Sequence, residues 1–121
     1  MNDDTDFFDR HGRATCHSPD GENLYLWNGK PVGYVDDDRI YSYRGRLLGW
    51  FLNGWVYDRS NRPALFSAAA SGGPVRPVRQ ARPAKSARQA RPARSVRQVA
   101  HVRPVRSMSW SPVAGADYFD Q

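Results

Sequence analysis

The sequence predicts an all-β protein, a shallow pseudo-fourfold barrel of short antiparallel hairpins followed by an extended basic arm rich in proline and arginine. Three observations support this expectation. A unit of about 16 residues recurs along the first half of the chain, turn-forming residues recur about every eight residues, and a later segment has a basic residue at every third position. The 121 residues are enough for one domain with a modest core.

The repeated unit begins with a tyrosine and ends nine residues later with a second aromatic residue. Three copies align without gaps over residues 25–34, 41–50 and 57–66, and a weaker copy begins at Phe8. Because side chains alternate between faces along a strand, we expect the repeated apolar positions to share one face and to be buried against each other. The predicted repeat core is Tyr25, Val32, Tyr34, Tyr41, Leu48, Trp50, Tyr57, Ala64 and Phe66.

Each unit contains a turn signal at its centre. Asn28-Gly29 predicts a type I′ hairpin turn, in which both residues have positive φ and Tyr25 pairs with Val32. Weaker signals stand at the corresponding places of the other units: His11-Gly12, Arg44-Gly45 and Ser60-Asn61. Further turn signals separate the units, at Asp20-Gly21, 36–38 and Asn53-Gly54. We therefore expect an antiparallel meander that closes on itself and leaves few exposed edges.

Charge is divided unevenly between the hairpin region and the arm (residues 71–107). Residues 1–75 carry 8 Lys+Arg and 10 Asp+Glu, whereas residues 76–106 carry 10 Lys+Arg and no acid. The basic residues follow a three-residue period with Ala100 as the one gap, and Gln80, Gln89 and Gln98 mark a nine-residue period above it. A three-residue period places all basic side chains on one edge of a polyproline II helix, so we expect that extended conformation.

The arm is predicted to bind a polyanion, because forked guanidinium groups suit phosphate and carboxylate. The candidate residues are Arg76, Arg79, Arg82, Lys85, Arg88, Arg91, Arg94, Arg97, Arg103 and Arg106. No aromatic residue lies between them, so contact with nucleic acid would involve the backbone rather than stacked bases. A disordered, solubilising tail is the alternative. We expect an ordered arm either to project or to bend back with its Val/Ala edge facing the barrel.

The predicted organisation has four parts. Residues 1–6 form an acidic tail, 7–70 the hairpin domain, 71–107 the arm, and 108–121 a C-terminal segment in which Trp110 is a possible anchor. Because the four apolar faces lie before Gly72, we expect residues 1–73 to fold alone. The single cysteine, the acidic N-terminus without a signal sequence and the short longest apolar run, 47–52, favour a cytoplasmic protein, with membrane association left open.

Chemistry-bearing motifs are missing from the sequence. The cysteine and the histidines lack the paired spacing of a metal site, and the acidic run 36–38 is typical of a turn. Residues 71–74 lack the Lys-Ser/Thr of a phosphate loop, and no arrangement of Ser, Cys, His and Asp indicates a nucleophile. We expect no enzyme, and no catalytic, cofactor or metal site.

Several of these segments together resemble the bacterial four-fold beta-flower proteins. The resemblance rests on residues 27–34, residues 41–51 and the Val/Ala-Arg-Pro arm that ends in the Ser-x-Ser-Trp-Ser of residues 107–111. It covers about residues 24–111, and the first unit more loosely. The order of hairpins, basic arm and terminal motif carries it. The resemblance implies a shallow, petal-like β-barrel and no catalytic residues.

Two functional hypotheses follow. In the first, the protein is a non-enzymatic binding or scaffold module whose basic arm engages an anionic surface, either a nucleic-acid backbone or anionic lipid. In the alternative, it is a structural interaction protein whose arm docks on its own barrel or on a partner subunit and has no polyanion ligand. The sequence leaves the oligomeric state open.

Overall fold

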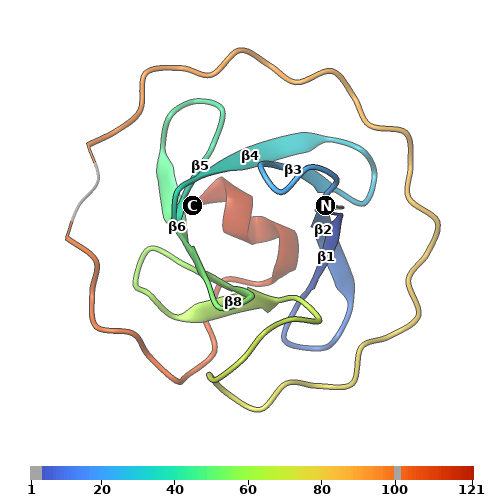
Figure 1. The fold of residues 1–121 in the computed structure, drawn as a ribbon, viewed down its shortest axis with the longest axis vertical. Helices are drawn as coiled ribbons and strands as arrows, with labels where there is room; N and C mark the ends of the chain where they lie inside the picture. Colours follow the sequence, from blue (N-terminus) through green and yellow to red (C-terminus); the bar gives the residue numbers. More distant parts are fainter. Residues whose placement is uncertain (1–3, 100–101) are drawn as a thin grey trace.

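Eight strands form a closed barrel in the computed structural model, which describes residues 4–99 and 102–121 (Figure 1). Each strand pairs antiparallel with its neighbours in sequence, and the last pairs with the first. The strands are β1 (Thr5–Phe8), β2 (Ala14–Ser18), β3 (Asn23–Leu26), β4 (Pro31–Asp36), β5 (Arg39–Tyr41), β6 (Leu47–Leu52), β7 (Trp55–Tyr57) and β8 (Pro63–Phe66). The predicted all-β barrel of antiparallel hairpins is confirmed. Thr5 and Asp6 belong to β1 rather than to an acidic tail, and residues 1–3 lie outside the described part.

The four hairpins have the same tip. In the second one, the Gly29 N–H donates to the Leu26 carbonyl and the Leu26 N–H donates to the Lys30 carbonyl, both at 2.9 Å. The other three tips repeat both hydrogen bonds. Only one residue of each tip has a left-handed backbone: Gly12, Gly29, Gly45 and Asn61. The type I′ turn predicted at Asn28-Gly29 is therefore wrong, because Asn28 does not have positive φ.

A β-bulge in each hairpin changes which residues face the barrel interior. Tyr25 pairs with Pro31 and Leu24 with Gly33, so Val32 is the extra residue between two pairs. Leu48 and Ala64 hold the same place in the third and fourth hairpins. The bulge shifts the alternation by one residue. The predicted pairing of Tyr25 with Val32 and the single shared face are therefore wrong.

The predicted repeat core is divided between the two faces of the barrel wall. Leu48 and Ala64 belong to the inner cluster, and Val32 packs against it. The aromatic residues lie in a second, outer cluster, which holds Phe8, Tyr34, Tyr41, Tyr43, Leu47, Trp50, Trp55, Tyr57, Phe66 and Ala70. Tyr25 is also buried, in a stack with His17. An aromatic surface on the outside of a barrel needs a cover, and the arm supplies it.

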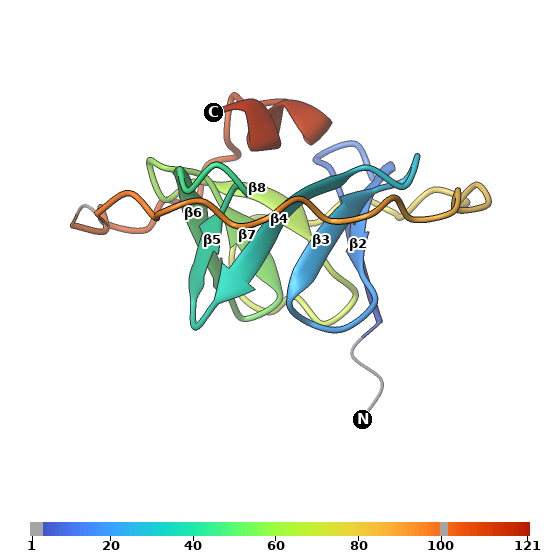
Figure 2. The ribbon, with the colours of Figure 1, turned by 90° about the horizontal axis from the view of Figure 1, so that it is seen from above.

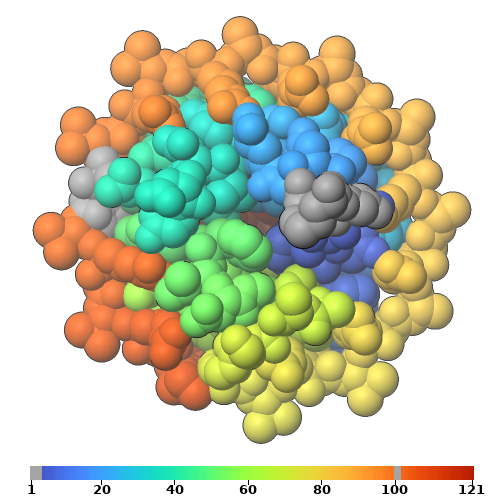
Figure 3. Space-filling view, in the orientation of Figure 1, coloured from blue at the N-terminus to red at the C-terminus, as the bar shows by residue number. Residues whose placement is uncertain are grey.

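The arm runs around the barrel as a ring between its two ends (Figures 1 and 2). It contains neither helix nor strand over residues 71–99 and 102–107, and the space-filling view shows it as an outer rim (Figure 3). Its backbone donates hydrogen bonds to one residue of each hairpin tip: Gln80 to Gly12 (2.8 Å), Gln89 to Gly29 (2.9 Å), Gln98 to Gly45 (2.7 Å) and Ser107 to Asn61 (3.0 Å). The nine-residue period of the arm therefore equals one quarter of the ring.

Glycine at the tips permits this close approach. A Cβ atom on Gly29 would lie 2.0 Å from the Ala87 carbonyl oxygen, and one on Gly45 would lie 2.0 Å from the Val96 carbonyl oxygen. Both glycines also have φ near +90°, which side-chain-bearing residues rarely adopt. The glycines of the repeat therefore serve the turn and the docking of the arm together.

The C-terminal segment closes one end of the barrel with the 3-10 helix η1 (Gly115–Asp120) (Figure 2). Tyr118 and Phe119 join the inner cluster, and the Tyr118 hydroxyl donates to the Tyr57 carbonyl at 2.8 Å. Trp110 packs on Trp55 in the outer cluster, with ring centroids 5.5 Å apart. The core therefore extends beyond Gly73, so the reason for expecting residues 1–73 to fold alone is wrong.

No helix within the described residues is long and apolar enough to cross a membrane.

Candidate anion-binding surfaces

Eight of the ten basic side chains of the arm contact the barrel while remaining partly exposed, whereas Arg76 and Arg106 make no such contact among the described residues. One position of the nine-residue period places a guanidinium over the first aromatic of a hairpin. Arg79 lies 5.7 Å from the Phe8 ring centroid, and Arg97 lies 5.2 Å from that of Tyr41. Arg88 holds the same place over Tyr25, at 5.7 Å. Cations over aromatic faces are stabilised by about 0.5–1 kcal/mol each at exposed sites.

A second position of the period combines a ring contact with an ion pair. Lys85 lies over Trp27 (5.1 Å) and its ammonium is 2.8 Å from an Asp6 carboxylate oxygen. Arg94 lies over Tyr34 (3.9 Å) and pairs with Glu22. Arg103 lies over Trp50 (5.3 Å) and pairs with Asp38 at 3.6 Å. Three quarters of the ring thus repeat one contact pattern.

The third position of the period is less regular. Arg82 pairs with Asp6, and Arg91 donates to the Tyr25 hydroxyl at 3.2 Å. The next place falls on Ala100, which lies outside the described residues. Arg97, from the first position, also pairs with Asp36. Half of the predicted polyanion-binding residues are therefore ion-paired with the barrel: Arg82, Lys85, Arg94, Arg97 and Arg103.

The valine edge of the arm points outward. Its described valines, Val75, Val78, Val96, Val99, Val102 and Val105, are 89–95 % exposed. The expectation that a docked arm would turn its Val/Ala edge inward is therefore wrong. The outer barrel surface is aromatic and is bordered by carboxylates, so it attracts guanidinium groups with their aliphatic stems more strongly than small alkyl groups.

The two ends of the barrel carry opposite charge. The turns between hairpins, together with the start of β1, hold the carboxylates Asp4, Asp6, Asp20, Glu22, Asp36, Asp37 and Asp38. We call this the acidic end. Five of these acids pair with the arm: Asp4, Asp6, Glu22, Asp36 and Asp38. The arm therefore neutralises most of the acidic end.

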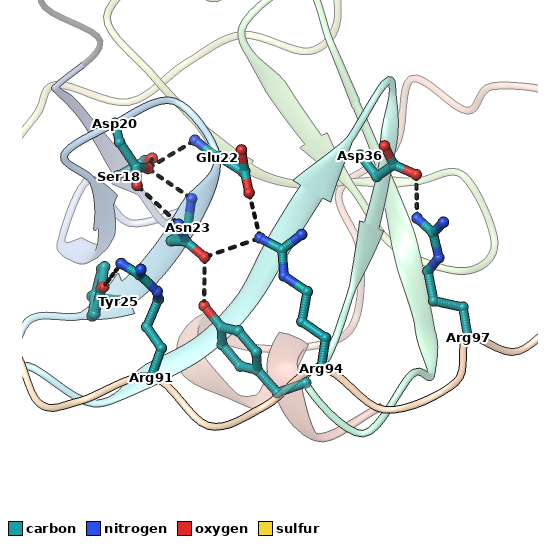
Figure 4. A network of polar contacts seen from close by, with 10 residues as sticks. Ser18, Asp20, Glu22, Asn23, Tyr25, Asp36, Arg91, Arg94 and Arg97 are labelled. Atoms are coloured by element: carbon teal, nitrogen blue, oxygen red, sulfur yellow. Dashed lines mark hydrogen bonds and ion pairs between the residues drawn. The ribbon is translucent and has the colours of Figure 1, made fainter.

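A polar network connects the acidic end to the arm (Figure 4). Asp20 accepts hydrogen bonds from the backbone N–H of Asn23 (2.8 Å) and from its side-chain amide (2.9 Å), and such bonds lower the Asp20 pKa to about 2 although burial opposes this. The side-chain oxygen Oδ1 of Asn23 accepts from the Tyr43 hydroxyl (2.9 Å) and from Arg94 (3.4 Å). Burial raises the pKa of Tyr43 to about 12, so the phenol stays a donor.

The other end of the barrel, which we call the tip end, is basic. All four hairpin tips lie there, beside η1, because a closed up-and-down meander brings alternate turns to one end. Its exposed cations are Arg10, Arg13, Lys30, Arg44, Arg46 and Arg62. Only Arg13, which contacts Asp9 at 3.2 Å, forms an ion pair within the described residues. Asp9 and Asp58 are buried in the turns, and Asp117 and Asp120 lie in η1.

Sequence reasoning missed the tip end. Lys30, Arg46 and Arg62 hold equivalent places in three repeats, and this coincidence was the available signal. The polyanion-binding site was predicted in the arm because basic residues are denser there. The structure separates the two sets: most arm cations contact the barrel, whereas Arg13 alone of these tip cations has a carboxylate partner within residues 4–99 and 102–121.

The described residues contain no metal-ligand cluster and no exposed thiol. No cluster of three His, Cys, Asp or Glu side chains there has the proximity that a metal ion needs. Cys16 is fully buried in the inner cluster, and burial raises the pKa of its thiol far above the ordinary value. A buried, protonated thiol is a poor nucleophile.

A family model described as the 4-fold beta flower protein matches residues 5–119. The chain belongs to this family. The match spans the barrel, the arm and the C-terminal helix, so the arm is part of the beta-flower unit rather than an appendage to it. No curated protein and no solved structure matched the chain.

Proposed function

We propose that this beta-flower protein is a non-enzymatic binding module that engages an anionic surface through the tip end of its barrel. One observation carries the proposal. Exposed tip cations without carboxylate partners gather at one end, while the arm pairs with five of the seven carboxylates of the other end. The net charge of the molecule is +6. The tip end therefore attracts anions, and the acidic end repels them only weakly because most of its carboxylates are paired with the arm.

The arm has a structural role in this proposal. Its cations are directed at rings and carboxylates of the barrel, which supports the alternative in which the arm docks on its own barrel. We therefore assign the contact with the anionic surface to Lys30, Arg46, Arg62 and their neighbours instead of to the arm. The arm holds the hairpins in place and frees the tip end for a partner.

Anionic lipid suits the tip end better than nucleic acid. The four hairpins stand around the barrel axis (Figure 1), and each contributes one or more cations at its tip. A ring of charges fits a plane of headgroups, whereas a duplex backbone would favour a stripe. We place the protein at the cytoplasmic face of a membrane, where the leaflet is anionic.

Cosedimentation with vesicles tests this proposal. Vesicles of phosphatidylcholine alone are compared with vesicles that also contain phosphatidylserine. One variant carries Lys30→Gln, Arg46→Gln and Arg62→Gln, and the matched control carries Arg79→Gln, Arg88→Gln and Arg97→Gln. Both change the net charge from +6 to +3, so they differ in the place of the charge and not in its amount.

The tip variant is expected to lose about 100-fold in affinity for the phosphatidylserine vesicles, since each surface cation contributes about 1 kcal/mol. The arm variant is expected to lose much less. Equal losses of affinity would show that only the net charge matters. A larger loss in the arm variant would show that the arm, and not the tip end, binds the vesicle. A gel shift of duplex DNA by the same proteins, abolished by the tip substitutions, would redirect the proposal to nucleic acid.

A further inference from the structure

A hollow lies between the arm and the barrel wall, and none of the tip cations used above lines it. It is lined by His17 and Tyr25 of the barrel and by arm residues 85–93, and it has a volume of about 1,020 Å³. We call it the second-quarter hollow, because the arm there passes the tip of the second hairpin, where the Gln89 N–H donates to the Gly29 carbonyl. It opens to solvent beside the ring of the arm.

Two guanidinium groups converge on one tyrosine in this hollow. Arg88 lies over the Tyr25 ring at 5.7 Å, and Arg91 donates to the Tyr25 hydroxyl at 3.2 Å. Neither has a carboxylate within ion-pair distance among the described residues. Two like charges on one side chain repel each other, so the pair is poised for a bridging anion.

The equivalent places in the other quarters are different. In the first quarter, Arg82 holds the place of Arg91 and pairs with Asp6. In the third, Arg97 holds the place of Arg88 and pairs with Asp36, and Ala100 holds the place of Arg91. The second quarter is therefore the one described quarter in which both arginines are present and neither is neutralised.

His17 provides a second, independent observation. The residue is only 2 % exposed, and neither ring nitrogen has a hydrogen-bond partner. It stacks on Tyr25 at 5.9 Å and meets Trp27 edge-on at 5.4 Å, at the barrel wall of the hollow. A buried polar group without a partner is rare and needs an explanation. A bound ligand that draws the imidazole toward the hollow supplies one.

We propose that the second-quarter hollow binds the phosphate group of a small phosphomonoester, with Arg88 and Arg91 as its ligands and His17 as a neutral donor at the wall. Two guanidinium forks offer more donors than one carboxylate can accept, whereas a phosphate dianion offers three terminal oxygens. Gln89 and Ser86 line the same hollow and add polar groups at its rim. The site is independent of the tip end.

The test is an NMR titration of the full chain with inorganic phosphate at constant ionic strength, following the arginine Nε–H and histidine ring signals. Saturable shifts are expected at Arg88, Arg91 and His17. Arg88→Gln and Arg91→Gln should each weaken the phosphate affinity about tenfold or more. Arg88→Lys, which retains the charge and loses the fork, should also weaken it.

The matched controls are Arg79→Gln and Arg97→Gln, which remove the equivalent arginines of the neighbouring quarters. Each should leave the phosphate affinity unchanged. Shifts of equal size at all arm arginines, or no saturation, would overturn the site. Equal shifts with acetate would overturn the phosphate assignment. The titration uses free phosphate and no vesicles, so the two tests are independent. A negative titration would not contradict vesicle binding by the tip end, and a lack of vesicle binding would not contradict this site.

Discussion

The arm and the hairpin tips are both rich in arginine and lysine, yet their cations have different surroundings. Arg94 lies 3.9 Å from a tyrosine ring centroid and pairs with Glu22, whereas Lys30 at a tip is exposed and has no carboxylate partner among the described residues. Counting charges along the sequence finds the arm first, because its cations are densest. The comparison teaches that a dense basic segment can be an internal counter-ion, while a sparse set on repeated turns forms the exposed charged face.

Removing the arm and the C-terminal segment should have the largest effect. A chain that ends at Gly73 exposes the outer aromatic cluster and loses Tyr118 and Phe119 from the inner one. We expect it to lose the cooperative thermal transition that the full chain shows by circular dichroism. A cooperative melt of this fragment would show that the barrel is stable without the arm and would contradict the structural role given to the arm cations.

Gly45→Ala should follow in size. The new Cβ would lie 2.0 Å from the Val96 carbonyl oxygen of the arm, and φ of +90° disfavours alanine, so the free energy of unfolding should fall by about 3 kcal/mol. Gly72→Ala is the matched control. Its φ is also positive, but nothing lies within 4 Å, so about 1 kcal/mol is expected in urea unfolding. Equal losses would mean that the arm does not press on the tip.

Much of the fold was readable from the sequence, and the physical limits are specific. The repeat of tyrosine, glycine and aromatic residues predicted four hairpins and a closed barrel, and the structure confirms them. The sequence did not predict on which face of the barrel wall the aromatic side chains lie. The extra residue at Val32, or at Leu48, inverts the two-residue alternation of side chains. The docking of the arm was open because its partners, such as Glu22 for Arg94, lie 72 positions away.

The candidate sites were less readable. Tip cations from separate repeats lie at the same end of the barrel only because the topology brings alternate turns to that end. The second-quarter hollow depends on which carboxylates reach which arginines, and no local pattern encodes that.

The buried His17 should give a measurable pH dependence. Burial, with a smaller contribution from Lys85, lowers the His17 pKa below the ordinary 6.5, while Asp6 acts in the opposite direction. The unfolded chain therefore binds the proton more tightly, so the stability that His17 contributes is complete above pH 6.5 and is lost as the pH falls toward the lower folded pKa. The loss is limited to about 1.4 kcal/mol per unit of pKa difference.

Urea unfolding at a series of pH values checks this. His17→Gln should flatten the stability curve below pH 6.5. The Asp20 pKa of about 2 keeps that carboxylate out of this range. An unchanged slope in the variant would show that His17 is as solvated in the fold as in the unfolded chain.

Single ion pairs of the arm should have the smallest effect. Arg94→Gln removes the pair with Glu22, whose side chains are 41 % and 54 % exposed, so a loss of about 0.5–1 kcal/mol that shrinks with added salt is expected. Lys30→Gln, at a tip, should change the unfolding free energy by less. A larger loss for Lys30→Gln would contradict the assignment of the two regions.

Amide hydrogen exchange along the arm tests the central claim most directly. The backbone N–H groups of Gln80, Ser86, Gln89, Ser95, Gln98 and Ser107 donate to barrel carbonyls at 2.7–3.0 Å. The Arg88 and Arg97 amides between them have no such acceptor among the described residues. A docked arm predicts slow exchange at the six bonded amides, recurring with the nine-residue period, and fast exchange at the intervening ones. Uniformly fast exchange from residue 75 to residue 107 would show a free arm and would contradict the account.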